Sequence, residues 1–319
     1  MKIIFMGTPE IATHCLNRLL ESHHQISAVV TQPDKPSGRG QKISLSPVKK
    51  LAISKNIPVF TPEKLMKEKF YEVLKPFEPD VIVVIAYGKI LPPEILNIPR
   101  LGCINIHLSL LPKYCGAAPI QWALLNNEKK TGVTIMKMNE GLDTGDILMA
   151  EELDILDDDD AISLSYALIL IGADLLLKVL ESAEKTNKLV GTSQDHSLVS
   201  YAPQIKKEQG KIKWIEKSIA IKNKVRALIP WPTAYSSLND KLLKILKVDI
   251  FMNDDEIDLR GKEEPKSGTI SGMLKNYGPI VKTGDGYVII LKAQPENKKV
   301  LNGTDLINGG YVKVGSEFD

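Results

Sequence analysis

Short apolar runs alternate with helical segments through the first 185 residues, and this alternation limits the fold more than any other feature of the sequence. The runs are almost continuously apolar, as in strands buried on both faces, and cover residues 2–6, 26–30, 81–85 and 103–106. Helices are predicted after Pro9 and at residues 47–54, 62–74 and 161–185. The alternation predicts an α/β fold, with a mostly parallel sheet covered by helices on both faces.

The pattern changes near residue 189. Residues 189–210 show no sustained periodicity and are typical of a linker. The strands predicted beyond them are short and alternating, at residues 233–238, 242–248, 268–270 and 286–292. They predict a smaller antiparallel barrel or sandwich. We therefore expect a first domain over residues 1–188, a linker over 189–210 and a second domain over 211–319.

Composition is typical of a soluble globular protein. Of the 319 residues, 43% are hydrophobic and 25% are charged. The first apolar run is too short for a signal segment, and the most apolar stretch, residues 166–180, is interrupted by a glycine and by charges, so no membrane span is expected. Three cysteines lack any pairing spacing and are expected as free thiols in a reducing, cytoplasmic compartment: Cys15, Cys103 and Cys115.

Basic residues gather in two parts of the chain. Residues 209–319 carry 18 Lys and Arg against 14 Asp and Glu, a net charge of +4, which permits a polyanionic partner. The polar loop at 32–47 is longer than ordinary connections in such folds. Its basic residues are Lys35, Arg39 and Lys42. Such a loop suits a phosphate-rich substrate, although a solvated surface loop has the same composition.

Several common cofactor sites are disfavoured. The first strand–helix turn, GTPEIA at residues 7–12, matches neither GxGxxG nor GxxxxGK[ST], which argues against a nicotinamide or ATP enzyme. No HxxxH pair or cysteine cluster accompanies the one histidine of the expected site, so no metal is expected there. Four acids at residues 157–160 fit the N-cap of the long predicted helix better than a metal site.

Asn105 and His107 are expected to project from one face at the end of a strand, because residues two apart in an extended chain point the same way. Asp143, in the sequence GLDTGD, follows another strand-like run and could fold back beside them. A carboxamide that donates to an oxyanion, an imidazole that moves protons and a carboxylate that tunes the imidazole suit transfer of an acyl-level carbon to an amine.

Other roles stay open for these residues. His107 could be a structural histidine, or it could activate Cys115 as a thiol nucleophile. Asp143 and Asp146 lie in a glycine-rich turn, where an aspartate often bonds only to its own backbone. Spacing alone does not choose among these roles.

Several segments together resemble the methionyl-tRNA formyltransferase family over essentially the whole chain. They are MGTPEIA, QPDKPSGRGQKISLSPVK, IAYGKILP, LGCINIHLSLLPKYCGAAPIQWAL, TGVTIMKMNEGLDTGDIL and IPWPTAY. The NIH, SLLP and GLDTGD elements are shared by enzymes that use 10-formyltetrahydrofolate, while the basic loop, GAAPI and the second domain narrow the resemblance to the tRNA enzymes. The resemblance implies a Rossmann-like catalytic domain followed by an OB-like β-barrel that binds tRNA.

The implied reaction transfers a formyl group from 10-formyltetrahydrofolate to the α-amino group of methionyl initiator tRNA, without a metal. The implied catalytic residues are Asn105, His107 and Asp143. The implied folate contacts are Ser109, Leu110, Leu111 and Pro112, with Ala86, Tyr87, Gly88, Ile90 and Leu91 helping to wall the pterin pocket. The tRNA contacts expected from the basic loop and the basic second domain are Lys35, Arg39, Lys42, Lys211, Lys213 and Arg226.

Two positions depart from the family pattern. Leu108 stands where the family usually has a small residue, and Cys115 where a basic residue is more usual, so the folate pocket and one phosphate contact are in question. The rival functions are a 10-formyltetrahydrofolate enzyme that acts on a small amine or hydrolyses the donor, and a non-enzymatic RNA-binding protein. A monomer is expected because the sequence shows no exposed apolar helix stripe.

Overall fold

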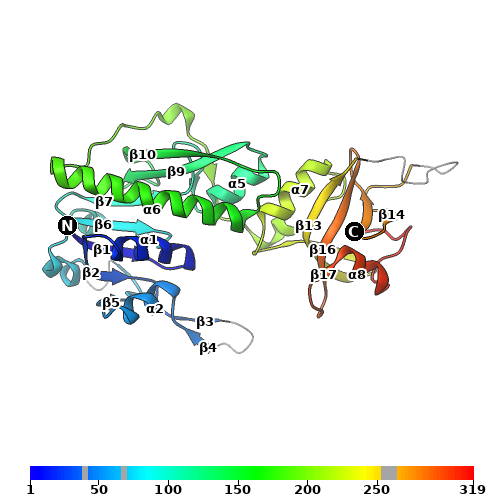
Figure 1. Ribbon diagram of the computed structural model, residues 1–319, viewed down its shortest axis with the longest axis horizontal. Coiled ribbons are helices and arrows are strands. Elements are labelled where there is room, and N and C mark those ends of the chain that lie inside the picture. Colours follow the sequence, from blue (N-terminus) through cyan, green and yellow to red (C-terminus); the bar gives the residue numbers. More distant parts are fainter. Residues whose placement is uncertain (38–41, 66–69, 253–263) are drawn as a thin grey trace. The chain divides into compact units, whose positions relative to one another are not determined.

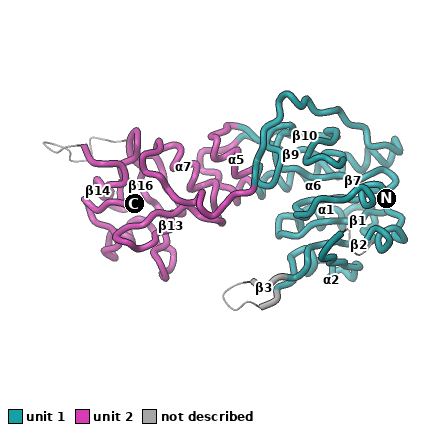
Figure 2. Tube along the Cα trace, turned by 180° about the vertical axis from the view of Figure 1, so that it is seen from behind, with its two compact units in different colours: residues 1–119, 130–154, 165–203 teal, residues 120–129, 155–164, 204–319 magenta. Residues whose placement is uncertain are grey.

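The computed structural model describes residues 1–37, 42–65, 70–252 and 264–319. The chain forms two compact units, which Figure 2 shows in different colours. The first consists of residues 1–119, 130–154 and 165–203, and the second of 120–129, 155–164 and 204–319. The segment predicted as a linker, residues 189–210, is thus divided between them. Its strand β11 (Tyr201–Ala202) pairs with β8 (Cys115–Gly116) inside the first unit.

A seven-stranded sheet forms the centre of the first unit, in the order β10-β9-β7-β6-β1-β2-β5. Its strands are β1 (Lys2–Gly7), β2 (Gln25–Val30), β5 (Val59–Phe60), β6 (Val81–Ile85), β7 (Cys103–His107), β9 (Lys130–Lys137) and β10 (Ile147–Asp154). The five strands from β5 to β7 are parallel, whereas β9 and β10 are antiparallel to their neighbours. The predicted α/β fold and its four apolar strands are confirmed.

Helices cover both faces of this sheet (Figure 1). Helices α1 (Glu10–Leu20) and α6 (Ala161–Thr186) lie side by side. A hydrogen bond from Arg18 Nε to Asp174 Oδ1, at 2.9 Å, joins them. On the other face, α3 (Phe70–Leu74) and α4 (Pro93–Leu96) contribute Phe70 and Ile95 to one core cluster with Ile82 of β6. The remaining elements of this unit are α2 (Pro47–Ser54), the hairpin β3 (Lys35–Ser37) and β4 (Lys42–Ser44), and the 3₁₀ turns Lys75–Phe77 and His196–Leu198.

The helix predicted at 62–74 is wrong in its first part, because residues 62–65 are not helical and 66–69 lie outside the described residues. The ammonium of Lys89 donates to the carbonyls of Pro62 (2.6 Å) and Glu63 (2.8 Å). These contacts stabilise an irregular loop at a place where periodicity alone predicts a helix.

Helix α6 is long and apolar enough, by length and composition, to cross a membrane. It nevertheless packs closely on the sheet, since a Cβ atom at Gly172 would lie 3.0 Å from side-chain atoms of Ile106 and Val133. Its N-terminus is capped as predicted: Asp160 Oδ1 accepts hydrogen bonds from the N–H groups of Ile162 and Ser163. The helix also exposes an apolar stripe that was not evident from the sequence: Ile162, Tyr166 and Leu170.

The second unit is built on an antiparallel sheet in the order β12-β13-β16-β15-β14, with β17 paired to β16. The strands are β12 (Ala234–Leu238), β13 (Lys241–Phe251), β14 (Ile270–Leu274), β15 (Gly278–Lys282), β16 (Tyr287–Pro295) and β17 (Leu301–Asn302). The helices of the unit are α5 (Pro119–Leu125), α7 (Ser218–Ala227), α8 (Gly303–Asn308) and the 3₁₀ turn Lys207–Gly210. Strands β15 and β17 and helices α5, α7 and α8 were not predicted, and the strand predicted at 268–270 begins only at Ile270.

Residues at the end of the chain connect the two edges of this second sheet. Phe318 bridges Leu238 at the end of β12, and Glu317 bridges Thr269 just before β14. The Phe318 ring also stacks on the buried Trp214, with ring centroids 4.9 Å apart. The C-terminal segment thus bridges the gap between the edge strands, in agreement with the predicted barrel-like second domain.

Candidate active site

Strand β7 presents alternate side chains to the face covered by α4. Cys103 packs there beneath α4, with its Sγ atom 3.9 Å from the Ile95 carbonyl oxygen. Asn105 and His107 follow on the same face at the carboxyl end of the strand, where open α/β sheets bind ligands. Within the described residues, no group hydrogen-bonds to the half-buried Asn105 carboxamide, so its N–H groups remain available to a substrate.

His107 is held in one orientation. The side chain is 6% exposed, and its Nε2 atom lies 2.9 Å from the carbonyl oxygen of Tyr114. Because a carbonyl oxygen can only accept, Nε2 must carry the hydrogen. The other nitrogen, Nδ1, faces Asp143 Oδ2 at 3.6 Å, which is beyond hydrogen-bond distance. The ring therefore points an ordered nitrogen toward a carboxylate without being hydrogen-bonded to it.

Asp143 lies in the loop between β9 and β10, in a left-handed conformation with φ 54°. Its Oδ2 atom accepts a hydrogen bond from the Gly116 main-chain N–H at 2.8 Å, so the side chain does not merely bond to its own turn. Asp146 likewise reaches outside the turn and accepts from the Ser193 hydroxyl at 3.1 Å. The structure thus places His107 and Asp143 side by side, with Asn105 two residues before His107 on the same face of β7.

The Asp143 loop depends on two residues that sequence reasoning missed as site residues. Gln194 donates from Nε2 to the carbonyls of Asp143 (2.8 Å) and Gly145 (2.7 Å). A Cβ atom at Gly145 would overlap the Lys137 carbonyl, so the loop needs glycine there. Gln194 comes from the aperiodic segment after α6, where no sequence signal distinguishes it.

The SLLP segment is a tightly bonded loop. Ser109 Oγ donates to the Lys113 carbonyl at 2.6 Å, and Thr134 Oγ1 donates to the Ser109 carbonyl at 2.6 Å. The Leu111 N–H in turn donates to Thr134 Oγ1, and the Leu111 side chain packs with Cys115 and Met136. Of the four predicted folate contacts here, Ser109 and Leu111 are buried, while Leu110 and Pro112 are partly exposed.

The segment predicted to wall the pterin pocket follows β6. Ala86, Gly88 and Ile90 are exposed there, whereas Tyr87 and Leu91 are buried in the core cluster beneath. The carbonyl of Tyr87 accepts from Gln32 Nε2 at 2.9 Å and from Thr8 Oγ1 at 3.3 Å, which fixes the backbone. Burial also raises the pKa of the Tyr87 hydroxyl to about 12. The accessible surface of the expected pterin pocket is made by the exposed residues Ala86, Gly88 and Ile90.

Cys115 is not an activated nucleophile. Its thiol is buried and lies 3.4 Å from the Pro112 carbonyl oxygen. Burial, followed by the negative charge of Asp143, raises the pKa of the thiol to about 11. A nucleophilic cysteine needs the opposite shift. All three cysteines are buried free thiols, as predicted.

The predicted tRNA-binding residues fall into two groups. Lys35 and Lys42 lie on the β3–β4 hairpin, whose backbone alone is described, and Arg39 lies outside the described residues. Lys211 and Lys213 are exposed and alternate with the buried Ile212 and Trp214.

The Arg226 guanidinium, in contrast, makes its hydrogen bonds within the protein. Its Nη1 atom donates to the Leu156 carbonyl at 3.1 Å, and its Nε atom donates to Asn223 Oδ1 at 3.0 Å. Two lysines of the same helix are paired as well, because Lys224 contacts Glu216 at 2.7 Å and Lys222 contacts two aspartates. On this helix, positive charge predicted from the sequence is largely neutralised in the fold.

The α/β domain followed by a smaller antiparallel domain is the architecture of the one-carbon transferases that transfer formyl groups. The formyl transferase family matches residues 1–180, and the formyl transferase C-terminal domain matches residues 204–310. A methionyl-tRNA formyltransferase from Clostridioides difficile is 45% identical over 99% of both chains, and one from Thermodesulfovibrio yellowstonii is 44% identical over 99% of this chain and 98% of its own. The chain belongs to the formyl transferase family and, within it, to the methionyl-tRNA formyltransferases.

Solved structures agree on the fold. A methionyl-tRNA formyltransferase from Clostridium thermocellum, 20% identical, superposes with a TM-score of 0.56 over 79% of this chain and 94% of its own. The sugar 3N-formyl transferase WlaRD, solved in the presence of dTDP and 5-N-formyl-THF, is 25% identical, with a TM-score of 0.66 over 94% of this chain and 99% of its own.

Proposed function

We propose that this protein transfers a formyl group from 10-formyltetrahydrofolate to the α-amino group of methionyl initiator tRNA, giving N-formylmethionyl-tRNA for translation initiation. The observation that supports the proposal is the approach of Asp143 Oδ2 to His107 Nδ1 at the carboxyl end of β7, with Asn105 two residues earlier on the same face of the strand. The relatives that match the chain end to end bear the name of this activity.

Asn105 stabilises the oxygen that becomes negative when the amine adds to the formyl carbon. Its carboxamide needs no ionisation to donate, and its position on β7 fixes it between β6 and β9. Loss of one such donor typically raises the barrier by about 2.7–4 kcal/mol.

His107 and Asp143 handle the charge and protons that the reaction moves. The Tyr114 carbonyl fixes the ring through Nε2, which leaves Nδ1 directed toward Asp143 and the reacting atoms. The Asp143 carboxylate favours a positive charge on this ring as a proton passes through it. General acid–base assistance of this kind is worth roughly 10²–10⁴ in rate.

Folate fits the chain beside this trio. The donor cosubstrate would be held by the exposed wall residues Ala86, Gly88 and Ile90, and by the main chain and Leu110 of the Ser109–Pro112 loop. The hydrogen bonds of Thr134 stiffen that loop, so it needs little ordering on binding. The buried Tyr87, Leu91, Ser109 and Leu111 act by positioning this surface.

For tRNA, we assign phosphate contacts to Lys35, Arg39 and Lys42 of the basic loop and to Lys211 and Lys213 of the second unit. Arg226 remains a predicted contact, although its hydrogen bonds to the 155–160 segment favour a structural role. We further propose a cytoplasmic enzyme that acts as a monomer, although α6 exposes Ile162, Tyr166 and Leu170, and that acts without a membrane. Close packing of α6 on the sheet supports the last point.

The test is formyl transfer from 10-formyltetrahydrofolate to methionine-charged initiator tRNA, with elongator methionyl-tRNA and the His107→Ala variant run beside it. Product on the initiator alone, lost in the variant while tRNA binding remains, supports both substrate and trio. Folate binding without product on either tRNA would instead favour a small-amine formyltransferase or a hydrolase.

A further inference from the structure

Two adjacent histidines and a distant glutamate meet at the edge of the first sheet that lies opposite the trio. His23 and His24 form the turn just before β2, and Glu184 lies in the last turn of α6. Strand β2 is parallel to β7 through β1 and β6, so its first residues lie at the amino edge of the sheet, while His107 ends β7 at the carboxyl edge. The cluster is therefore separate from the proposed active site.

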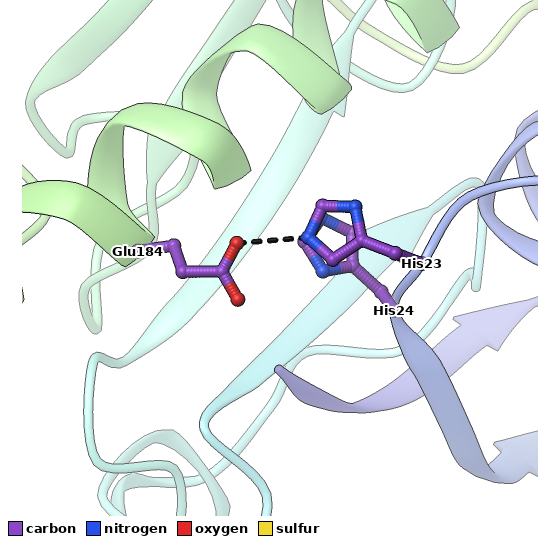
Figure 3. Close-up of side chains that lie close together, drawn as sticks. All are labelled: His23, His24 and Glu184. Carbon is purple, nitrogen blue, oxygen red and sulfur yellow. Dashed lines mark hydrogen bonds and ion pairs between the residues drawn. The ribbon is translucent and has the colours of Figure 1, made fainter.

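The three side chains face one another (Figure 3). The Nε2 atom of His23 lies 2.8 Å from Glu184 Oε2, and the two imidazole centroids are 4.1 Å apart. One ligand atom from each of the three residues lies within 4.8 Å of the other two. The set offers two imidazole nitrogens and one carboxylate oxygen.

A buried ring nitrogen of His24 is the second observation that points to a ligand at this cluster. The residue is 6% exposed, its Nδ1 atom lies 3.3 Å from the N-terminal ammonium of Met1, and its buried Nε2 atom has no hydrogen-bond partner. Buried polar atoms are normally satisfied, so an orphaned imidazole nitrogen beside a carboxylate calls for a partner.

We propose that His23, His24 and Glu184 bind a Zn²⁺ ion. Two histidines and one glutamate are an established donor set for zinc, with a water in the fourth position. Tetrahedral bonds of about 2.1 Å place donors roughly 3.4 Å apart, so the present atoms must close in by no more than about 1.5 Å. His23 and Glu184 have side chains that are 61% and 42% exposed, which leaves room for that movement.

The site would join the turn before β2 to the end of α6. These segments are already linked by the His23–Glu184 contact, which is charged only when the histidine is protonated, and by the N-terminal ammonium of Met1, which lies 3.3 Å from His24 Nδ1 and 3.4 Å from Glu184 Oε1. A zinc ion would replace these contacts by its bonds to two imidazoles and one carboxylate. The role is structural, because the trio lies at the other edge of the sheet.

The test uses untagged protein treated with EDTA and then titrated with Zn²⁺ by calorimetry, with thermal unfolding in parallel. We expect one Zn²⁺ per chain at this site and a rise in Tm of about 5 °C at a hundredfold excess over Kd. His23→Ala and Glu184→Gln should each weaken the affinity about 100-fold and remove the rise in Tm, while formyl transfer is retained.

Matched controls decide the location. Glu181→Gln, one turn earlier on α6, and His196→Ala, an exposed histidine elsewhere, should bind Zn²⁺ as the unchanged protein does. Co²⁺ offers a second readout, since its visible absorption should appear with the unchanged protein and be absent with His23→Ala. Equal affinity in the His23 and Glu184 variants, or loss of binding only in His107→Ala, would overturn the proposal.

Discussion

The Oδ2 atom of Asp143 serves two neighbours at once: it faces His107 Nδ1 at 3.6 Å and accepts the Gly116 N–H at 2.8 Å. The second contact fixes the carboxylate in place without using the histidine. In the proposed mechanism, Asp143 therefore acts on His107 through its charge, while the 3.6 Å gap leaves His107 Nδ1 available for proton exchange.

The Asp143→Asn change tests this electrostatic role. An asparagine oxygen can still accept from Gly116, so the loop should keep its shape, but the negative charge is lost. We expect kcat for formyl transfer to fall about 100-fold or more, with little change in tRNA affinity. Steady-state kinetics and tRNA titration measure both, and Asp146→Asn in the same loop is the matched control. A full rate in Asp143→Asn would remove the aspartate from the mechanism.

The Cys115 thiol gives a prediction about chemical modification. With its pKa raised to about 11, by burial first and Asp143 second, only about one thiol in 10⁴ is ionised at pH 7. We expect iodoacetamide to modify Cys115 very slowly at pH 7 and faster as the pH rises. Cys115→Ala should keep most of the activity. Mass spectrometry of labelled peptides, with urea-unfolded protein as the reactive control, measures the labelling; fast loss of activity at pH 7 would contradict the buried, protonated thiol.

The parallel strands were predictable because strands buried on both faces read as continuous apolar runs, as Val81–Ile85 does. Asn105 and His107 were predictable as a pair because a strand places residues two apart on one face. Gln194 was not, since its role depends on a loop folding back over 51 positions to the Asp143 carbonyl. The sequence shows only a polar residue in an aperiodic segment.

Counting charges along the sequence overestimated the basic surface of α7 for a related reason. Lys222 and Arg226 belong to the basic segment 209–319, yet the fold sets Asp157 and Asp249 against Lys222 and satisfies Arg226 with carbonyl oxygens. Asp157 lies 65 positions before Lys222, and Asp249 lies 27 positions after it on β13. Net charge by segment therefore overstated the cationic surface, which includes Lys211 and Lys213.

Lys211 and Lys213 should account for part of the salt dependence of tRNA binding. Each phosphate contact contributes about −0.9 to the slope of log K against log salt on a duplex, and about −0.7 on a single strand. The double change Lys211→Gln and Lys213→Gln should therefore weaken binding at low salt and make the slope less steep by about 1.5. Fluorescence titration of tRNA between low and moderate salt gives the slope. The exposed pair Lys298 and Lys299, changed in the same way, is the control, and an equal effect there would argue against a localised contact.

Lys222 should stabilise the second unit over a defined pH range. Its ammonium lies 2.7 Å from Asp157 and 2.9 Å from Asp249, and its side chain is 11% exposed, while those of the aspartates are 80% and 55% exposed. The hydrogen bond and charge of Lys222 lower the pKa of Asp157. Burial lowers the pKa of Lys222, but the two carboxylates outweigh it and raise the pKa overall.

Both shifts fix the sign of the pH dependence. A lowered aspartate pKa stabilises the fold above the unfolded value near 4 and is lost as pH falls through the folded value. A raised lysine pKa stabilises the fold below the unfolded value near 10.4 and is lost as pH rises further. Lys222→Met should therefore reduce the free energy of unfolding by about 1 kcal/mol near pH 7, because the partners are largely solvated. The deficit should shrink below about pH 4 and above about pH 10.5.

Denaturant unfolding across this pH range measures the deficit, and the exposed Lys241→Met variant is the control. A deficit that stays constant with pH would mean that lost packing, not the ion pairs, explains the effect.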